Sequence, residues 1–162
     1  MFNLARVGLA CAGAVMLAAC ANDEPDVSKP AAFEFGATVA QIDSNLEGEC
    51  EAKTLREITP PQIPGATLHQ QIDCQGFEYF GDKRLAELVF GDDKLLLVWV
   101  LVNEEDLDPM DEAFTGKFGD PAFKSDTIAL YENVHSAVRR DVPEALYYSP
   151  DIADLVKAMA SQ

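Results

Sequence analysis

The chain has few cationic side chains, and few of the histidines and cysteines that bind transition metals. It contains 12 Lys and Arg against 28 Asp and Glu, a formal net charge of −16 at pH 7, and only two His and four Cys. Such an excess of negative charge excludes a broad phosphate-binding surface, so nucleic acid is not an expected partner. No C-x-x-C pair occurs. The sequence therefore predicts no metal site and no cofactor.

A long apolar run is also missing. The N-terminal apolar segment extends only from Val7 to Ala19, after the basic residue Arg6, whereas a helix that spans a membrane needs about 20 apolar residues. A basic end, a short apolar stretch and small residues at its close are typical of a secretory signal peptide. We therefore expect residues 1–19 to be a signal peptide.

The residues that close this segment, Leu17-Ala18-Ala19-Cys20, resemble the lipobox of bacterial lipoproteins. In that family the signal is cut before the cysteine, so the resemblance implies that Cys20 is acylated and begins the mature chain. The alternative is an ordinary secretory signal followed by a chance cysteine. Ala21, rather than Asp, follows Cys20. By the same resemblance this favours anchoring in the bacterial outer membrane, with the protein facing the periplasm.

The rest of the chain predicts a tether and one domain. Residues 20–32 are poor in large apolar side chains and contain two prolines, which is typical of a flexible linker. Residues 33–162 are enough for a single compact domain with its own core. Without residues 1–19 the chain keeps 11 basic and 28 acidic side chains, a net charge of −17. This charge favours basic partners and opposes contact with an anionic lipid surface.

Two cysteines, Cys50 and Cys74, remain in the domain. A secreted protein reaches an oxidising compartment, so we expect these two residues to form a disulfide. A redox pair or a metal site is the alternative interpretation.

The pattern of apolar residues and turn signals predicts the order of elements. Thr38 and Gln41 have the spacing of a capping box for a helix over 38–47. A second helix is expected to begin within Asp106 to Asp108, with Asp108 as its cap and Pro109 as its first residue, and to end at Gly119. A third is expected to start at Ser149. Segment 53–58 fits a strand or a helix, and 59–65, with three prolines, predicts an irregular loop. Strands are expected over 67–73, 77–80, 85–90, 95–102, 126–131, 136–140 and 145–148.

This order predicts the α+β class, an antiparallel sheet with helices packed on one face. It also predicts a helix–meander unit that occurs twice, at about 35–102 and 109–148. The eight apolar residues 95–102 are typical of a strand at the centre of the sheet or covered on both faces.

The segment 36–48 is similar to the opening G-x-[ST]-x-x-[QE]-[VI]-x-x-x-[LI]-x-G of small periplasmic helix–meander domains. Its fixed positions are Gly36, Thr38, Gln41, Ile42, Leu46 and Gly48. Two families carry it: the small lipoprotein of the outer-membrane β-barrel assembly machinery, and β-lactamase-inhibitor-like proteins with two such units. The resemblance implies a protein-binding scaffold rather than an enzyme.

The residues typical of catalysis are sparse. His69 is expected on the polar side of a strand and His135 beside a turn, and Ser136 points away from its neighbour His135. A triad needs a base, a nucleophile and an orienting acid in contact, so we interpret both as surface histidines and the protein as no enzyme. The acidic run 104–112 fits a helix N-terminus, stabilised by unpaired N–H groups. A Ca²⁺ site is the alternative, although Met110 takes a ligand position of the calcium loop.

Six aromatic residues are expected on strands, where most aromatic side chains belong to the core. Tyr147 and Tyr148 are strand neighbours, so only one of them is expected to face the core, and the other is our candidate contact for a partner. The full set is Phe77, Tyr79, Phe80, Trp99, Tyr147 and Tyr148. The expected function is a lipid-anchored envelope lipoprotein that binds another envelope protein. The alternatives are a small-ligand or cation-binding module and a hydrolase whose site the sequence does not reveal.

Overall fold

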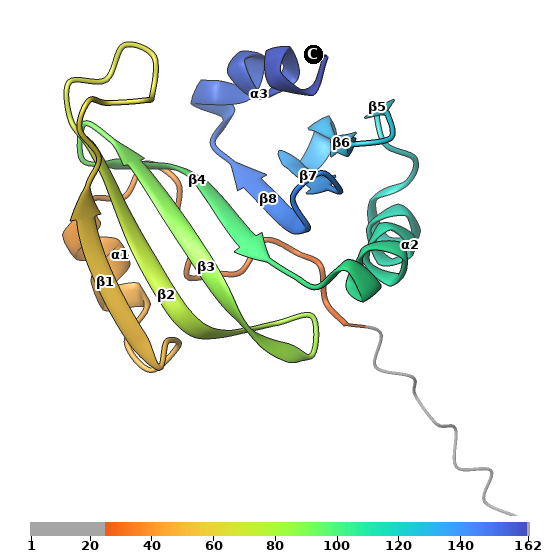
Figure 1. Ribbon diagram of the computed structural model, residues 1–162, viewed down its shortest axis with the longest axis horizontal. Helices are drawn as coiled ribbons and strands as arrows, with labels where there is room; N and C mark the ends of the chain where they lie inside the picture. The colour runs from red at the N-terminus through yellow and green to blue at the C-terminus, as the bar shows by residue number, and fades with distance from the viewer. Residues whose placement is uncertain (1–24, 162) are drawn as a thin grey trace, which may run out of the picture.

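The computed structural model describes residues 25–161 and contains one antiparallel sheet of eight strands (Figure 1). The predicted α+β class is confirmed. Three α-helices pack against the sheet: α1 (Val39–Asn45), α2 (Leu107–Phe118) and α3 (Ala153–Ala160). The strands are β1 (Ala52–Glu57), β2 (His69–Tyr79), β3 (Asp82–Gly91), β4 (Lys94–Leu101), β5 (Phe123–Lys124), β6 (Ile128–Tyr131), β7 (Ser136–Arg139) and β8 (Glu144–Tyr148). Short 3₁₀ turns are η1 (Glu104–Asp106), η2 (Glu132–Val134) and η3 (Pro150–Ile152).

The helix–meander unit occurs twice, as predicted. The strand order is β1-β2-β3-β4-β8-β7-β6-β5, so each helix α1 and α2 precedes a meander of four strands. The two meanders join where β4 pairs with β8, with Leu97 opposite Tyr148 and Trp99 opposite Leu146. β4 therefore lies at the centre of the sheet, as its apolar sequence predicted.

Local sequence chemistry explains where the helices begin. The Thr38 hydroxyl accepts a hydrogen bond from the Gln41 N–H, and the Gln41 side chain accepts one from the Thr38 N–H, so the predicted capping box is confirmed. The predicted cap of α2, Asp108, is wrong, because η1 leads directly into the helix and Asp106 takes the cap position. The helix begins at Leu107, and Pro109 is its third residue rather than its first. This position still lacks an intrahelical acceptor for an N–H group, so proline fits there as well.

The sheet is covered on both faces in its second half. The larger core lies between the sheet and α1 and α2, and includes Phe114 and Tyr147. A smaller core lies on the other face under α3, and includes Tyr148 and Val156. The expectation of helices on one face therefore holds for α1 and α2, whereas α3 lies on the opposite face. With helices on both faces, every residue of β6 and β8 is buried.

Three strand predictions change in detail. Segment 53–58 forms strand β1, and the two strands expected at 67–73 and 77–80 are one strand, β2. An irregularity between Gln75 and Phe77 lets β2 continue, since Gly76 adopts a φ of +76° that suits glycine. The two-residue strand β5 was not predicted.

The segment before α1 is part of the domain. Val27 and Phe33 are 1% and 0% exposed and belong to the larger core, and the Phe33 ring stacks on Phe77 at 5.0 Å. The prediction of a flexible tether over residues 20–32 is therefore wrong for its last residues, because Val27 supplies an apolar side chain that the core buries. The expected signal peptide and Cys20 lie outside the described residues. Within residues 25–161, no helix has the length and apolar character needed to cross a membrane.

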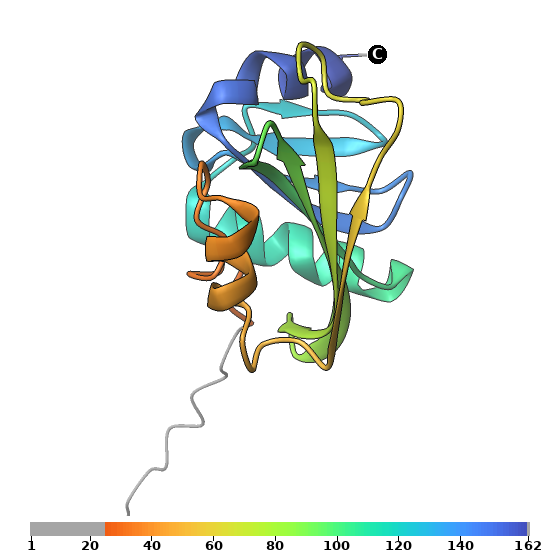
Figure 2. The ribbon, with the colours of Figure 1, turned by 90° about the vertical axis from the view of Figure 1, so that its left-hand side faces the viewer.

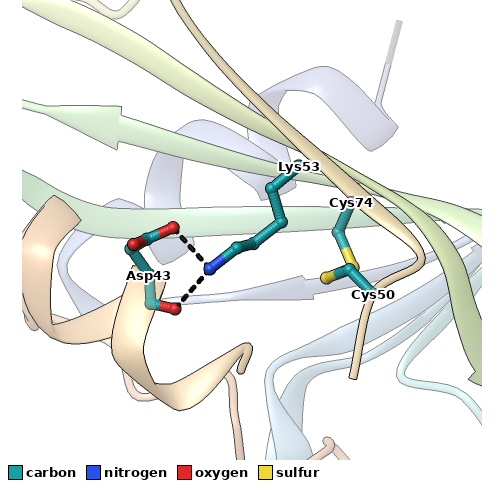
Figure 3. Close-up of a disulfide and its surroundings, with 4 residues drawn as sticks. All are labelled: Asp43, Cys50, Lys53 and Cys74. Atoms are coloured by element: carbon teal, nitrogen blue, oxygen red, sulfur yellow. Dashed lines mark hydrogen bonds and ion pairs between the residues drawn. A yellow bond between two sulfur atoms is a disulfide. The ribbon is translucent and has the colours of Figure 1, made fainter. Parts of the chain in front are cut away.

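The predicted disulfide between Cys50 and Cys74 is present, with the two Cα atoms 5.4 Å apart (Figure 3). It joins the segment before β1 to β2 on the side of the sheet that α1 covers. Lys53 reaches from β1 to α1, where its Nζ lies 2.6 Å from the Asp43 carboxylate and donates to the Asp43 carbonyl at 2.7 Å. The disulfide and this pair connect the edge strand to its neighbours.

Candidate binding surface

The outward side chains of β1–β4 form a sheet face that no helix of residues 25–161 covers over β1–β3 (Figures 1 and 2). Asp73, Glu87 and Trp99 are directly paired across β2, β3 and β4, and paired residues share a face. Trp99 packs against the smaller core, so this row faces away from α1 and α2. We call this surface the open face. Its other side chains are Arg56, Gln71, Leu85, Val89 and Leu97.

One part of the open face is charged. The Arg56 guanidinium donates two hydrogen bonds to Asp73, at 2.9 and 3.1 Å, and one to Glu87 at 3.4 Å. The Gln71 amide also donates to Asp73, at 2.7 Å. Exposed pairs of this kind contribute at most about 1 kcal/mol to stability. Their main effect here is on surface charge, because one cation faces two carboxylates and the cluster is net negative.

The neighbouring part of the open face is apolar. Leu85, Leu97 and Trp99 are each half-buried. Val89, directly opposite Leu97, is 5% exposed, and Glu87 separates it from Leu85 along β3. Large aliphatic and aromatic side chains beside charged ones are the composition of a protein-binding patch. An apolar area on a sheet is also the surface that a partner removes from water most favourably.

A second charged cluster borders Trp99. The Arg139 guanidinium lies 5.2 Å from the Trp99 ring centre, and it donates to Glu144 at 2.6 Å and to Asp141 at 2.8 Å. Burial raises the pKa of Glu144 to about 7, and the contact with Arg139 offsets this only in part, since Glu87 and Asp141 add to the rise. Glu144 therefore titrates near neutral pH at the edge of the open face.

The structure corrects the prediction for the two adjacent tyrosines. They face opposite sides of the sheet as expected, but Tyr147 and Tyr148 are 1% and 0% exposed. The prediction that one of them is exposed is wrong, because α3 covers the face on which Tyr148 lies. Neither ring is a surface contact for a partner. Burial also raises the pKa of both hydroxyls, that of Tyr148 to about 12.

The two histidines do not meet a nucleophile. His69 is 6% exposed, which corrects its prediction as a surface residue, and its Nδ1 accepts a hydrogen bond from the Gln62 N–H at 3.2 Å. Burial lowers the pKa of His69, and the charge of Arg56 lowers it further. The His135 ring packs edge-on against Tyr148, at 5.5 Å. Within residues 25–161 no Ser, Thr or Cys side chain donates a hydrogen bond to either imidazole.

Three of the six acidic residues in the run 104–112 at the start of α2 are paired with cations. Arg84 lies 2.8 Å from Asp106, and Arg140 lies 2.9 Å from Asp108 and 2.8 Å from Asp111. In the part of the chain that the structure describes, no cluster of three or more His, Cys, Asp or Glu side chains has the geometry to hold a metal ion. The arrangement matches the interpretation of this run as a helix N-terminus.

Sequence reasoning included Trp99 in a set of aromatic residues but did not find the open face. The apolar run 95–102 gave no sign that one side of it stays partly exposed. The charged clusters join distant strands, and only Arg139 and Glu144 flank a recognisable turn. Comparison of the chain with protein-family models, with curated proteins and with solved structures gives no match.

Proposed function

We propose that this chain is a lipid-anchored protein of the bacterial envelope, acylated at Cys20 and held at the outer membrane on the periplasmic side, that binds another envelope protein. The observation that carries the binding proposal is the open face. It offers half-buried Leu85, Leu97 and Trp99 beside a net negative cluster on a rigid sheet.

Charge selects the kind of partner. The chain without its first 19 residues has a net charge of −17, and both clusters at the open face contain one cation and two carboxylates. A partner with basic side chains around an apolar centre is complementary to this surface. The electrostatic part acts mainly on encounter, so it weakens as salt shortens the Debye length below about 8 Å.

Binding is tested by capture of cross-linked partners in intact envelopes, with variants that alter one property each. Glu87→Lys reverses a charge on the open face, where its side chain is 27% exposed. Glu112→Lys makes the same reversal on exposed α2, away from the open face. We expect Glu87→Lys to reduce capture about tenfold, in the range of an interface hot spot, and Glu112→Lys to leave it unchanged. Equal capture by the two variants would show that the binding surface lies outside the open face.

Anchoring is tested separately by the intact mass of protein extracted from membranes. Acylation at Cys20 predicts loss of residues 1–19 and added fatty-acid mass. A Cys20→Ser variant is expected to leave the membrane fraction. A soluble mature form with an unmodified N-terminus would overturn the anchoring proposal without affecting the open face.

A further inference from the structure

A cavity of about 90 Å³ lies where α3 meets the sheet, directly beside the open face. Trp99 belongs to both, so the cavity continues the apolar part of that surface. Most of its wall is apolar: Trp99, Ile128, Leu146, Val156, Met159 and Ala160. Met159 is 46% exposed, so the wall reaches solvent at a flexible side chain that adapts to what it contacts.

The polar side of the cavity disfavours an anionic ligand. Arg139 lines it, but each of its three guanidinium nitrogens already donates to a carboxylate: Nε and Nη2 donate to Asp141, and Nη1 donates to Glu144. The guanidinium also lies over Trp99. One cation against two carboxylates leaves a net negative charge, and the Asp141 side chain is 46% exposed. A ligand with an acid group would be repelled, whereas a cation beside the cavity would pair with Asp141.

The volume of the cavity limits the size of the apolar side chain that can enter it. An engineered apolar cavity of about 150 Å³ binds benzene, and each water of the liquid takes about 30 Å³. A volume near 90 Å³ is too small for an aromatic ring. It matches the four-carbon side chain of leucine or isoleucine.

We propose that this cavity is the anchor pocket for an aliphatic side chain, leucine or isoleucine, which a protein partner presents next to a lysine or arginine that pairs with Asp141. The inference rests on the proposed function, because it assigns the partner's central contact at the edge of the open face. Anchors of this kind, buried in a pocket and surrounded by weaker contacts, carry most of the energy of protein interfaces.

Trp99 provides a direct readout, because it is the only tryptophan in the chain. The purified full chain is titrated with three capped tripeptides that have lysine at both ends and leucine, phenylalanine or alanine in the middle, and Trp99 emission is followed. We expect a saturable change with the leucine peptide at a concentration at least tenfold lower than with the other two. Equal responses to all three peptides would overturn the proposal that the cavity binds an aliphatic side chain, since lysine charge alone would then explain binding.

A matched pair of α3 variants locates the effect. Ala160 lines the cavity and is 9% exposed, whereas Ala158 is exposed on the same helix. Ala160→Leu fills the cavity and is expected to weaken binding of the leucine peptide at least tenfold, while Ala158→Leu leaves it unchanged. Unchanged binding by Ala160→Leu would overturn the proposal. If Ala160→Leu does not fold, as judged by its melting temperature, the comparison of the three peptides on the unaltered chain decides.

The same variants separate this inference from the proposed function. Partner capture that falls in Glu87→Lys but not in a folded Ala160→Leu would retain the open face and reject the pocket. Capture that neither variant affects would reject both. Capture that both variants weaken, together with the leucine preference, is the expected result.

Discussion

The two halves of the sheet share one order of elements and differ in what covers them. In the first half, β2 and β3 are long strands with 11 and 10 residues, and they bury one face against α1 while no helix of residues 25–161 covers the other. In the second half, β6, β7 and β8 have only four or five residues and are sandwiched between α2 and α3. One repeated topology therefore gives a short half that helices cover on both faces and a long half in which one face has no helix over it among residues 25–161.

The largest expected effect comes from truncating one side chain in each half, both on the side of the sheet that faces away from α1 and α2. Tyr148 faces the α3 side and is 0% exposed, whereas Leu85 faces the same side of the sheet and is half-buried. We expect Tyr148→Ala to cost about 3–5 kcal/mol, since it leaves a large cavity, and Leu85→Ala to cost about 1 kcal/mol. Urea unfolding of both variants measures the two values. Similar losses would mean that the two halves are covered alike.

The disulfide provides the second test, because both of its cysteines lie in the first half. Cys50 and Cys74 are 24 residues apart, and the chain-entropy model gives about 3.5 kcal/mol for a loop of that length. We expect the double variant Cys50→Ala/Cys74→Ala to lose stability of that order. Hydrogen exchange is expected to quicken in β1 and β2 before β6 and β7. Uniform loss of protection across the sheet would show instead that the two halves unfold as one unit.

The third test uses pH at the junction of the two halves. The pKa of Glu144 is about 7 in the folded protein against an ordinary 4.5. The folded state then holds this proton more tightly than the unfolded chain does. Its contribution to stability is complete below pH 4.5 and is lost as the pH rises through 7. At about 1.4 kcal/mol per unit of pKa, the loss reaches about 3 kcal/mol.

Glu144→Gln removes this titration. The stability of the unaltered chain is therefore expected to fall relative to the variant between pH 5 and pH 8, as followed by thermal melting. Asp92→Asn is the control, because hydrogen bonds from Thr67 and Leu68 lower the pKa of Asp92, and its effect lies at more acidic pH. A constant difference between the unaltered chain and Glu144→Gln over this range would contradict the shift.

The features that local sequence determines were predictable. Thr38 and Gln41 specify a helix start through bonds three residues apart, and Gly119 ends α2 with a φ of +84°. The strands around the Gly81 and Asp92 turns follow from alternation and turn chemistry. Two cysteines in an expected oxidising compartment were enough to predict the disulfide.

The features that depend on tertiary packing were not predictable from the sequence. Nothing near Val27 indicates that the larger core buries it, because the core that receives it includes Tyr147, 120 residues later. The side of the sheet that α3 takes decides whether Tyr148 is exposed, and an apolar stripe on a helix does not specify which face it covers. The open face likewise depends on which parts of the sheet the helices leave uncovered, and the sequence does not specify this.

The finest test compares the hydroxyl groups of the two adjacent tyrosines. The Tyr147 hydroxyl donates to the Val27 carbonyl at 2.9 Å and accepts from Tyr79 at 2.8 Å, while the buried Tyr148 hydroxyl has no hydrogen-bond partner among residues 25–161. Tyr147→Phe leaves a buried carbonyl and a buried hydroxyl without this partner, so we expect it to cost about 1–3 kcal/mol.

Tyr148→Phe removes only an unpaired polar atom, and it is expected to leave stability unchanged or raise it by about 1 kcal/mol. Urea unfolding of the two variants side by side measures the difference, since each deletes one oxygen from neighbouring positions of β8. A loss in Tyr148→Phe equal to that in Tyr147→Phe would show that the α3 side supplies a partner for the Tyr148 hydroxyl. The contrast between a hydrogen-bonded tyrosine on the α2 face and a tyrosine without a hydrogen bond on the α3 face would then be wrong.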